Sequence, residues 1–115
     1  MEFTLNFIRL FLLDIFYASP VLLFLIALIC TIGLIIAKIE GWSSFDGIYH
    51  AFINATTVGY GDIRPTRAPA KLLAIALAII GLIFSGMIVA LALHAADYGF
   101  AEVYNTDRLL DRFAD

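Results

Sequence analysis

The chain has 115 residues, enough for one domain, and 63% of them are hydrophobic. A mean hydropathy of +0.97 places it in the membrane class of proteins. The net charge of −3 does not indicate a nucleic-acid partner, and the single cysteine, Cys30, excludes a disulfide within the chain. Enzyme chemistry is not indicated, because the sequence has no Ser/His/Asp set, no cluster of metal-ligating residues and no phosphate-binding loop.

The N-terminal segment, residues 1–18, is apolar but interrupted by polar side chains. Glu2, Asn6 and Arg9 recur at helical spacing among phenylalanine and leucine residues, which is typical of a helix lying at the membrane surface. The segment fits a simple extension of the first membrane span equally well. The acidic Glu2 and the interruption at Asp14 argue against a cleavable signal peptide.

The first membrane span is predicted at residues 20–39. It belongs to an uncharged run of 23 residues from Ile15 to Ala37. Ser19–Pro20 reads as an N-cap followed by the first helical residue. A helix of that run's length covers roughly 35 Å, against about 30 Å of membrane hydrocarbon. Trp42 follows where interfacial aromatic residues collect.

A short helix is predicted next, at residues 45–56, because Ser43 to Asp46 is a helix start signal with an acid in the first turn. It is too short to cross a membrane and would re-enter it, which is tolerated only where protein surrounds the helix. After a polar loop, 22 uncharged residues from Leu72 to Leu93 predict a second span at residues 69–94.

Together these elements predict an all-α membrane protein with two transmembrane helices and a re-entrant helix and loop between them. The expected division of the chain is an N-terminal segment at 1–18, a membrane domain at 19–96 and a C-terminal tail at 97–115.

The loop after the re-entrant helix carries the sequence Thr-Val-Gly-Tyr-Gly at residues 57–61. Gly59 and Gly61 adopt positive φ at little cost, while Val58 and Tyr60 can keep ordinary angles. Backbone angles that alternate in hand point successive carbonyls the same way. Such carbonyls can replace the water around a cation and still release it. Alone, Gly-Tyr-Gly-Asp also fits a simple turn, but the flanking spans and the short helix favour the carbonyl row.

This run resembles the selectivity filter of potassium channels, and residues 20–96 resemble the two-transmembrane pore of bacterial potassium channels. The resemblance implies a homotetramer around a central pore in a lipid bilayer, with permeant potassium ions and no organic cofactor. The expected potassium ligands are the backbone carbonyls of Thr57, Val58, Gly59 and Tyr60, together with the Thr57 hydroxyl. It also implies the inner cell membrane with both termini cytoplasmic. Charge does not decide this orientation, because the loop side holds four Lys or Arg and the terminal side three.

Residues around the filter are expected to support it. The resemblance assigns this role to Gly61, Asp62, Tyr49 and Trp42. Tyr49 and His50 fall where many relatives have an aromatic pair that braces the filter. His50 departs from that pair and is expected to be a hydrogen-bonded packing residue rather than a metal ligand. Ile53 replaces a glutamate that bonds the following aspartate in some bacterial relatives. We therefore expect Asp62 to bond the Tyr49 hydroxyl or the Trp42 indole N–H.

The second span carries the expected cavity and gate. Gly81 matches the hinge glycine of similar channels, and close packing against the re-entrant helix explains it equally well. One face is shared by Leu82, Ser85, Val89 and Leu93. By resemblance this face lines the cavity, with Val89 and Leu93 as a hydrophobic constriction. Four protonated copies of His94 would repel and open the gate at acid pH; the alternative is an interfacial histidine without a gating role.

The leading hypothesis is a passive potassium-selective channel. A less selective monovalent cation channel is one alternative, against which the intact Val-Gly-Tyr-Gly argues. A non-conducting membrane subunit that only binds a partner is another. Voltage sensing is not indicated, because the sequence has no arginine-repeat helix.

Overall fold

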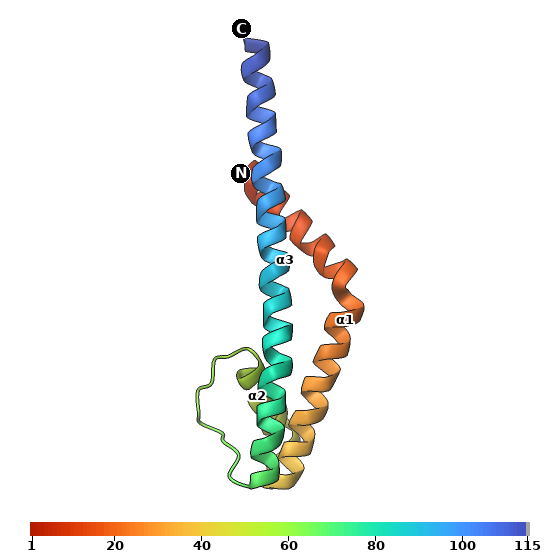
Figure 1. The fold of residues 1–115 in the computed structure, drawn as a ribbon, viewed down its shortest axis with the longest axis vertical. Coiled ribbons are helices and arrows are strands. Elements are labelled where there is room, and N and C mark those ends of the chain that lie inside the picture. Colours follow the sequence, from red (N-terminus) through yellow and green to blue (C-terminus); the bar gives the residue numbers. More distant parts are fainter. Residues whose placement is uncertain (115) are drawn as a thin grey trace. The chain divides into compact units, whose positions relative to one another are not determined.

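The computed structural model describes residues 1–114, and over these residues the chain forms three α-helices (Figure 1). They are α1 (Glu2–Glu40), α2 (Ser44–Ala55) and α3 (Ala68–Ala114). Both α1 and α3 are long and apolar enough to cross a membrane, whereas the 12 residues of α2 are too few. The predicted all-α fold, with two long apolar helices flanking a short one, is confirmed.

Contacts within the chain define two compact units. The central unit is residues 20–87 and contains α2, the loop after it and the adjoining parts of α1 and α3. The terminal unit is residues 1–19 together with residues 88–114. Residues 88–96 were predicted to be part of the membrane domain, but by their contacts they belong with the N-terminal segment.

Helix α1 does not begin at Pro20, so the predicted N-cap at Ser19 is wrong. Pro20 lies inside the helix, where its missing N–H leaves the carbonyl of Phe16 without its usual helical donor. The Ser19 hydroxyl donates to that carbonyl instead, at 2.7 Å. A Ser-Pro pair that looks like a helix start is thus accommodated within a continuous helix, as the extension alternative requires.

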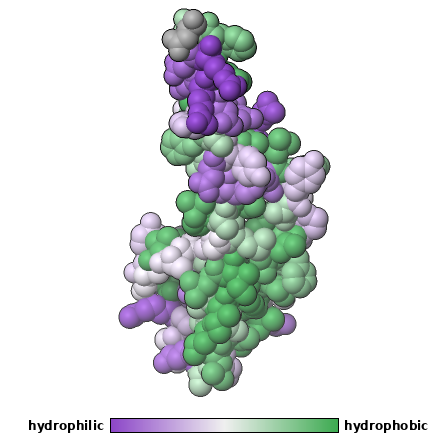
Figure 2. Space-filling model, turned by 45° about the horizontal axis from the view of Figure 1, so that its top comes forward, coloured by the Kyte–Doolittle hydropathy of each residue, from purple (hydrophilic) through white to green (hydrophobic). Residues whose placement is uncertain are grey.

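Helix α3 begins at Ala68, close to the predicted residue 69, but the predicted end at His94 is wrong because the helix continues to Ala114. No proline follows Pro69, so nothing obliges the helix to stop. Gly99 interrupts the sequence of good helix formers, and there the Phe3 ring packs 3.1 Å from where a Cβ would lie. Hydrophilic side chains gather on the C-terminal part of this helix (Figure 2).

The core of the central unit depends on a close crossing of α1 and α2. A Cβ on Gly33 would lie 2.7 Å from the Gly47 carbonyl oxygen, and a Cβ on Gly47 would lie 2.6 Å from the Gly33 oxygen. Neither position has room for a side chain. Helix α2 begins as predicted, since the Ser43 side chain accepts from the Asp46 N–H at 3.1 Å. Among residues 1–114, the largest fully buried side chains are Ile29, Ile36 and Leu77.

Candidate functional site

The loop that follows α2 has a backbone that alternates in hand. Thr57, Gly59 and Gly61 have φ of 65°, 60° and 79°, whereas Val58 and Tyr60 between them do not have positive φ. The positive φ predicted for the two glycines is confirmed. Sequence reasoning missed Thr57, because a non-glycine residue rarely adopts this conformation and keeps it only where its surroundings fix it.

The surroundings that fix this loop are the last carbonyls of α2. A helix leaves four carbonyls without helical donors at its C-terminus. Here these are the carbonyls of Phe52, Ile53, Asn54 and Ala55. The Thr56 N–H donates to the Phe52 carbonyl at 2.9 Å. The Thr57 N–H donates to the Asn54 carbonyl, and the Gly59 N–H to the Ile53 carbonyl, each at 3.1 Å. Ser85 of α3 donates its hydroxyl to the fourth, that of Ala55, at 3.0 Å.

These bonds set the direction of the loop carbonyls. A trans peptide holds its N–H and C=O on opposite sides, and residues 1–114 contain no cis peptide. Because the Gly59 N–H points at the Ile53 carbonyl, the carbonyl of Val58 points away from α2. The Thr57 N–H points at Asn54, so the carbonyl of Thr56 is also directed away from α2. The loop therefore presents backbone oxygens on the side opposite its own helix.

Asp62 follows the loop and accepts a hydrogen bond from the Tyr49 hydroxyl at 3.0 Å. Of its two expected partners, the structure therefore shows Tyr49. Trp42 instead packs edge-on against His50, with ring centroids 5.3 Å apart. His50 is 8% exposed, and its Nδ1 atom has no hydrogen-bond partner among the described residues. The burial of His50 fits the predicted packing role, and Nδ1 does not make the hydrogen bond expected of this residue.

The side chains of Val58 and Tyr60 are expected to point into a supporting wall. In the single chain they are 51% and 70% exposed, so this chain alone provides only part of such a wall.

A clamp at the end of α1 was not anticipated from the sequence. One carboxylate oxygen of Glu40 accepts from the backbone N–H groups of Thr66 and Arg67, at 2.8 and 2.7 Å, and the other accepts from the Thr66 hydroxyl at 2.8 Å. The Arg67 N–H is the main cause that holds the pKa of the Glu40 carboxyl below its ordinary value. An acid at the end of a span, with a Thr-Arg pair before the next helix, was the available signal.

Helix α3 meets α2 closely at Gly81, where a Cβ would lie 2.5 Å from the Ala55 carbonyl oxygen. The close-packing explanation of Gly81 therefore matches the structure, and the hinge role remains a prediction. The Asn54 amide also donates to the Ala74 carbonyl of α3 at 3.1 Å.

The expected cavity face of α3 is divided. Leu82, Val89 and Leu93 are 58–62% exposed in the single chain, and the Ser85 hydroxyl is bonded to α2.

In the terminal unit, His94 Nδ1 lies 2.8 Å from Asp14 Oδ2. Sequence reasoning gave His94 no acidic partner, because 80 positions separate the two residues.

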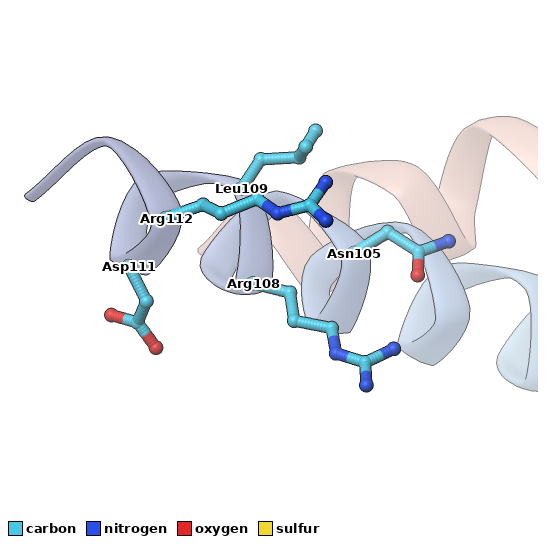
Figure 3. A pocket seen from close by; sticks show the side chains of 5 residues that line it. All are labelled: Asn105, Arg108, Leu109, Asp111 and Arg112. Carbon is cyan, nitrogen blue, oxygen red and sulfur yellow. The ribbon is translucent and has the colours of Figure 1, made fainter. Parts of the chain in front are cut away.

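Residues 1–114 contain no group of three or more His, Cys, Asp or Glu side chains placed to hold a metal ion. A surface hollow on the C-terminal part of α3 is lined by Asn105, Arg108, Leu109, Asp111 and Arg112 (Figure 3). All five project from neighbouring turns of one helix, so the hollow is open surface rather than a binding cavity.

Comparison with known proteins identifies the class. The model of a family described as "Ion channel" matches residues 21–96, which include α2, the loop and the apolar parts of α1 and α3. The chain therefore belongs to this ion channel family: it is a membrane protein with two spans and not an enzyme.

Three similar proteins bear the names of potassium channels. The chain is 38% identical over 55 residues to TWiK family of potassium channels protein 7 of Caenorhabditis elegans, covering 48% of the chain and 10% of that protein. It is 37% identical over 38 residues to potassium channel subfamily K member 13 of Rattus norvegicus, covering 33% of the chain and 9% of that protein. The chain is 33% identical over 53 residues to the Homo sapiens protein of the same name, covering 39% of the chain and 13% of that protein. The chain thus spans about a tenth of these relatives, and no solved structure matches it.

Proposed function

We propose that four copies of this chain form a potassium-selective channel of the two-transmembrane bacterial type. Potassium ions pass in single file along the carbonyls of Thr57, Val58, Gly59 and Tyr60, with the Thr57 hydroxyl at the inner end. The observation that carries the proposal is the alternating hand of the loop backbone, with positive φ at residues 57, 59 and 61. Selectivity then comes from replacing the hydration shell of the ion with peptide oxygens.

The half-exposed side chains around the loop support the fourfold assembly. Val58 and Tyr60 leave more than half of their surface open in the single chain, which leaves room for other copies to pack against them. Neighbouring copies would complete the wall behind these side chains. The Asp62–Tyr49 bond holds the outer end of the filter to α2.

The remaining roles follow from this arrangement. Leu82, Val89 and Leu93 on the open face of α3 line the cavity and its constriction, and Gly61 lets the chain leave the filter with positive φ. The assembly lies in the inner cell membrane with both termini on the cytoplasmic side.

The test is a flux assay on purified protein in liposomes with opposed potassium and sodium gradients, with and without barium. The proposal requires a tetramer and barium-sensitive flux that strongly favours potassium. Equal potassium and sodium flux would identify a less selective cation channel, and a monomer or dimer without flux would identify a non-conducting subunit.

A further inference from the structure

The C-terminus of α2 is closed mainly by the filter segment itself. Three of its last carbonyls accept from N–H groups of Thr56, Thr57 and Gly59. The fourth, on Ala55, accepts from the Ser85 hydroxyl, a group that belongs to a different helix. Ser85 is therefore the side chain through which α3 takes part in closing the end of α2.

Ala55 is held tightly between the two helices. It is fully buried, and Gly81 of α3 packs so closely on it that a Cβ would fall 2.5 Å from its carbonyl oxygen. Gly81 and Ser85 are four positions apart, so they lie one helical turn apart on the same face of α3. One turn of α3 thus contacts the backbone of Ala55 at Gly81 and its carbonyl at Ser85.

Ala55 lies two residues before Thr57, where the left-handed backbone begins. A non-glycine residue keeps that conformation only while its surroundings determine it. The Thr57 N–H is bonded to Asn54, next to Ala55, so a shift of Ala55 would be transmitted directly to the first residue of the filter.

We infer that Ser85 is a positioning residue for ion selection: its hydroxyl fixes the Ala55 carbonyl and so the inner end of the filter. Because Ser85 belongs to α3, any displacement of α3 at this turn alters the filter geometry through this bond. The inference rests on the proposed potassium channel function and adds a selectivity-determining side chain that is not itself an ion ligand.

The test compares Ser85→Ala, Ser85→Thr and Ser85→Cys in the assembled channel in liposomes. Loss of one hydrogen bond predicts a fall of roughly three- to ten-fold in the ratio of potassium to sodium flux for Ser85→Ala. Ser85→Thr keeps the hydroxyl and should retain the wild-type ratio, and the weakly donating thiol of Ser85→Cys should give an intermediate ratio. Gly86→Ala is the matched control, because a Cβ there meets no atom within 4 Å.

A merely structural role would lower the thermal stability of the Ser85→Ala assembly and leave its flux ratio unchanged; that result would overturn the inference. Where Ser85→Ala does not assemble, the Thr and Cys variants decide, and equal ratios for these two would overturn it. Wild-type protein without potassium-selective flux would remove the proposed function as well, whereas selective flux that is insensitive to residue 85 would remove only the role of Ser85.

Discussion

The contacts inside the central unit differ in kind from the contacts inside the terminal unit. In the central unit, Gly81 of α3 packs directly on the backbone of Ala55, and the Ser85 hydroxyl donates to the Ala55 carbonyl. In the terminal unit the contacts are between side chains: Phe3 stacks on Phe100 with ring centroids 4.2 Å apart, and His94 pairs with a partly exposed Asp14. Backbone contacts have no rotamers to adjust, whereas stacked rings and ion pairs can be remade. The difference predicts a central unit intolerant of change and a terminal unit that adapts.

The largest effect is expected from adding a single carbon to the central unit. Gly81→Ala forces a methyl group against the Ala55 backbone and should destabilise the assembly by about 1–3 kcal/mol, measured by thermal unfolding in detergent. Gly86→Ala, in open space on the same helix, should instead stabilise it by up to about 1 kcal/mol through helix propensity. Equal effects at the two positions would show that the close contact at Gly81 is not maintained in the assembly.

A smaller effect is expected where the central unit is held by one hydroxyl. Tyr49→Phe removes the donor to Asp62 and should lower stability in the same unfolding measurement by less than Gly81→Ala does. Tyr17→Phe in the terminal unit is the control, since that ring is 78% exposed and should give no measurable change. A Tyr49→Phe protein as stable as wild type would mean that Asp62 finds a different donor.

The ion pair of the terminal unit should contribute less than 1 kcal/mol, because His94 is 56% and Asp14 20% exposed. A double-mutant cycle with Asp14→Asn and His94→Gln measures this coupling. The imidazole of His94 also lies tilted against the Tyr98 ring of its own helix, with ring centroids 4.7 Å apart.

The same cycle separates two opposite effects of a charged His94. A charged imidazole attracts Asp14 within the terminal unit, whereas charged imidazoles on four copies would repel one another. If His94→Gln stabilises the protein at acid pH, repulsion dominates and the pair is secondary.

The smallest effect is local to the loop before α3. Glu40→Gln should speed hydrogen exchange at the amides of Thr66 and Arg67, because the carboxylate that accepts from both is gone. The lowered pKa of Glu40 means that the clamp is present above the ordinary glutamate pKa and is lost as pH falls through the lowered value. Wild-type protection factors at these amides should therefore fall on acidification. Glu102→Gln, at an exposed position of the terminal unit, should leave them unchanged.

Local signals in the sequence were sufficient for some of this structure. Ser43 and the acid after it predict the start of α2, and two glycines at alternate positions predict the hand of Gly59 and Gly61. In each case the residue type itself limits the backbone. The two spans could be predicted because a run of more than about 20 uncharged, mostly apolar residues is typical of a membrane-spanning helix.

Other features depend on partners distant in sequence, and the sequence does not specify those partners. The left-handed Thr57 requires the carbonyls of α2, and the clamp at Glu40 requires a loop 26 positions away. The Gly33–Gly47 crossing has the same origin, because a glycine in a helix does not reveal which backbone it will meet. The start of α1 was predicted wrongly for another reason. A Ser-Pro pair fits a helix N-terminus, but it also fits a helix interior in which the serine hydroxyl replaces the N–H that proline lacks.

The hydrogen bond from the Ser19 hydroxyl to the Phe16 carbonyl limits which substitutions the first span can accept. Phe16, Ser19 and Pro20 all lie in the uncharged run from Ile15 to Ala37, where little water is at hand for a carbonyl that loses its donor. Ser19→Ala would leave the Phe16 oxygen bare, whereas Ser19→Ala combined with Pro20→Ala would restore the ordinary helical donor. Ser19 is therefore not readily exchanged while Pro20 is present, whereas Pro20 can be replaced without changing Ser19.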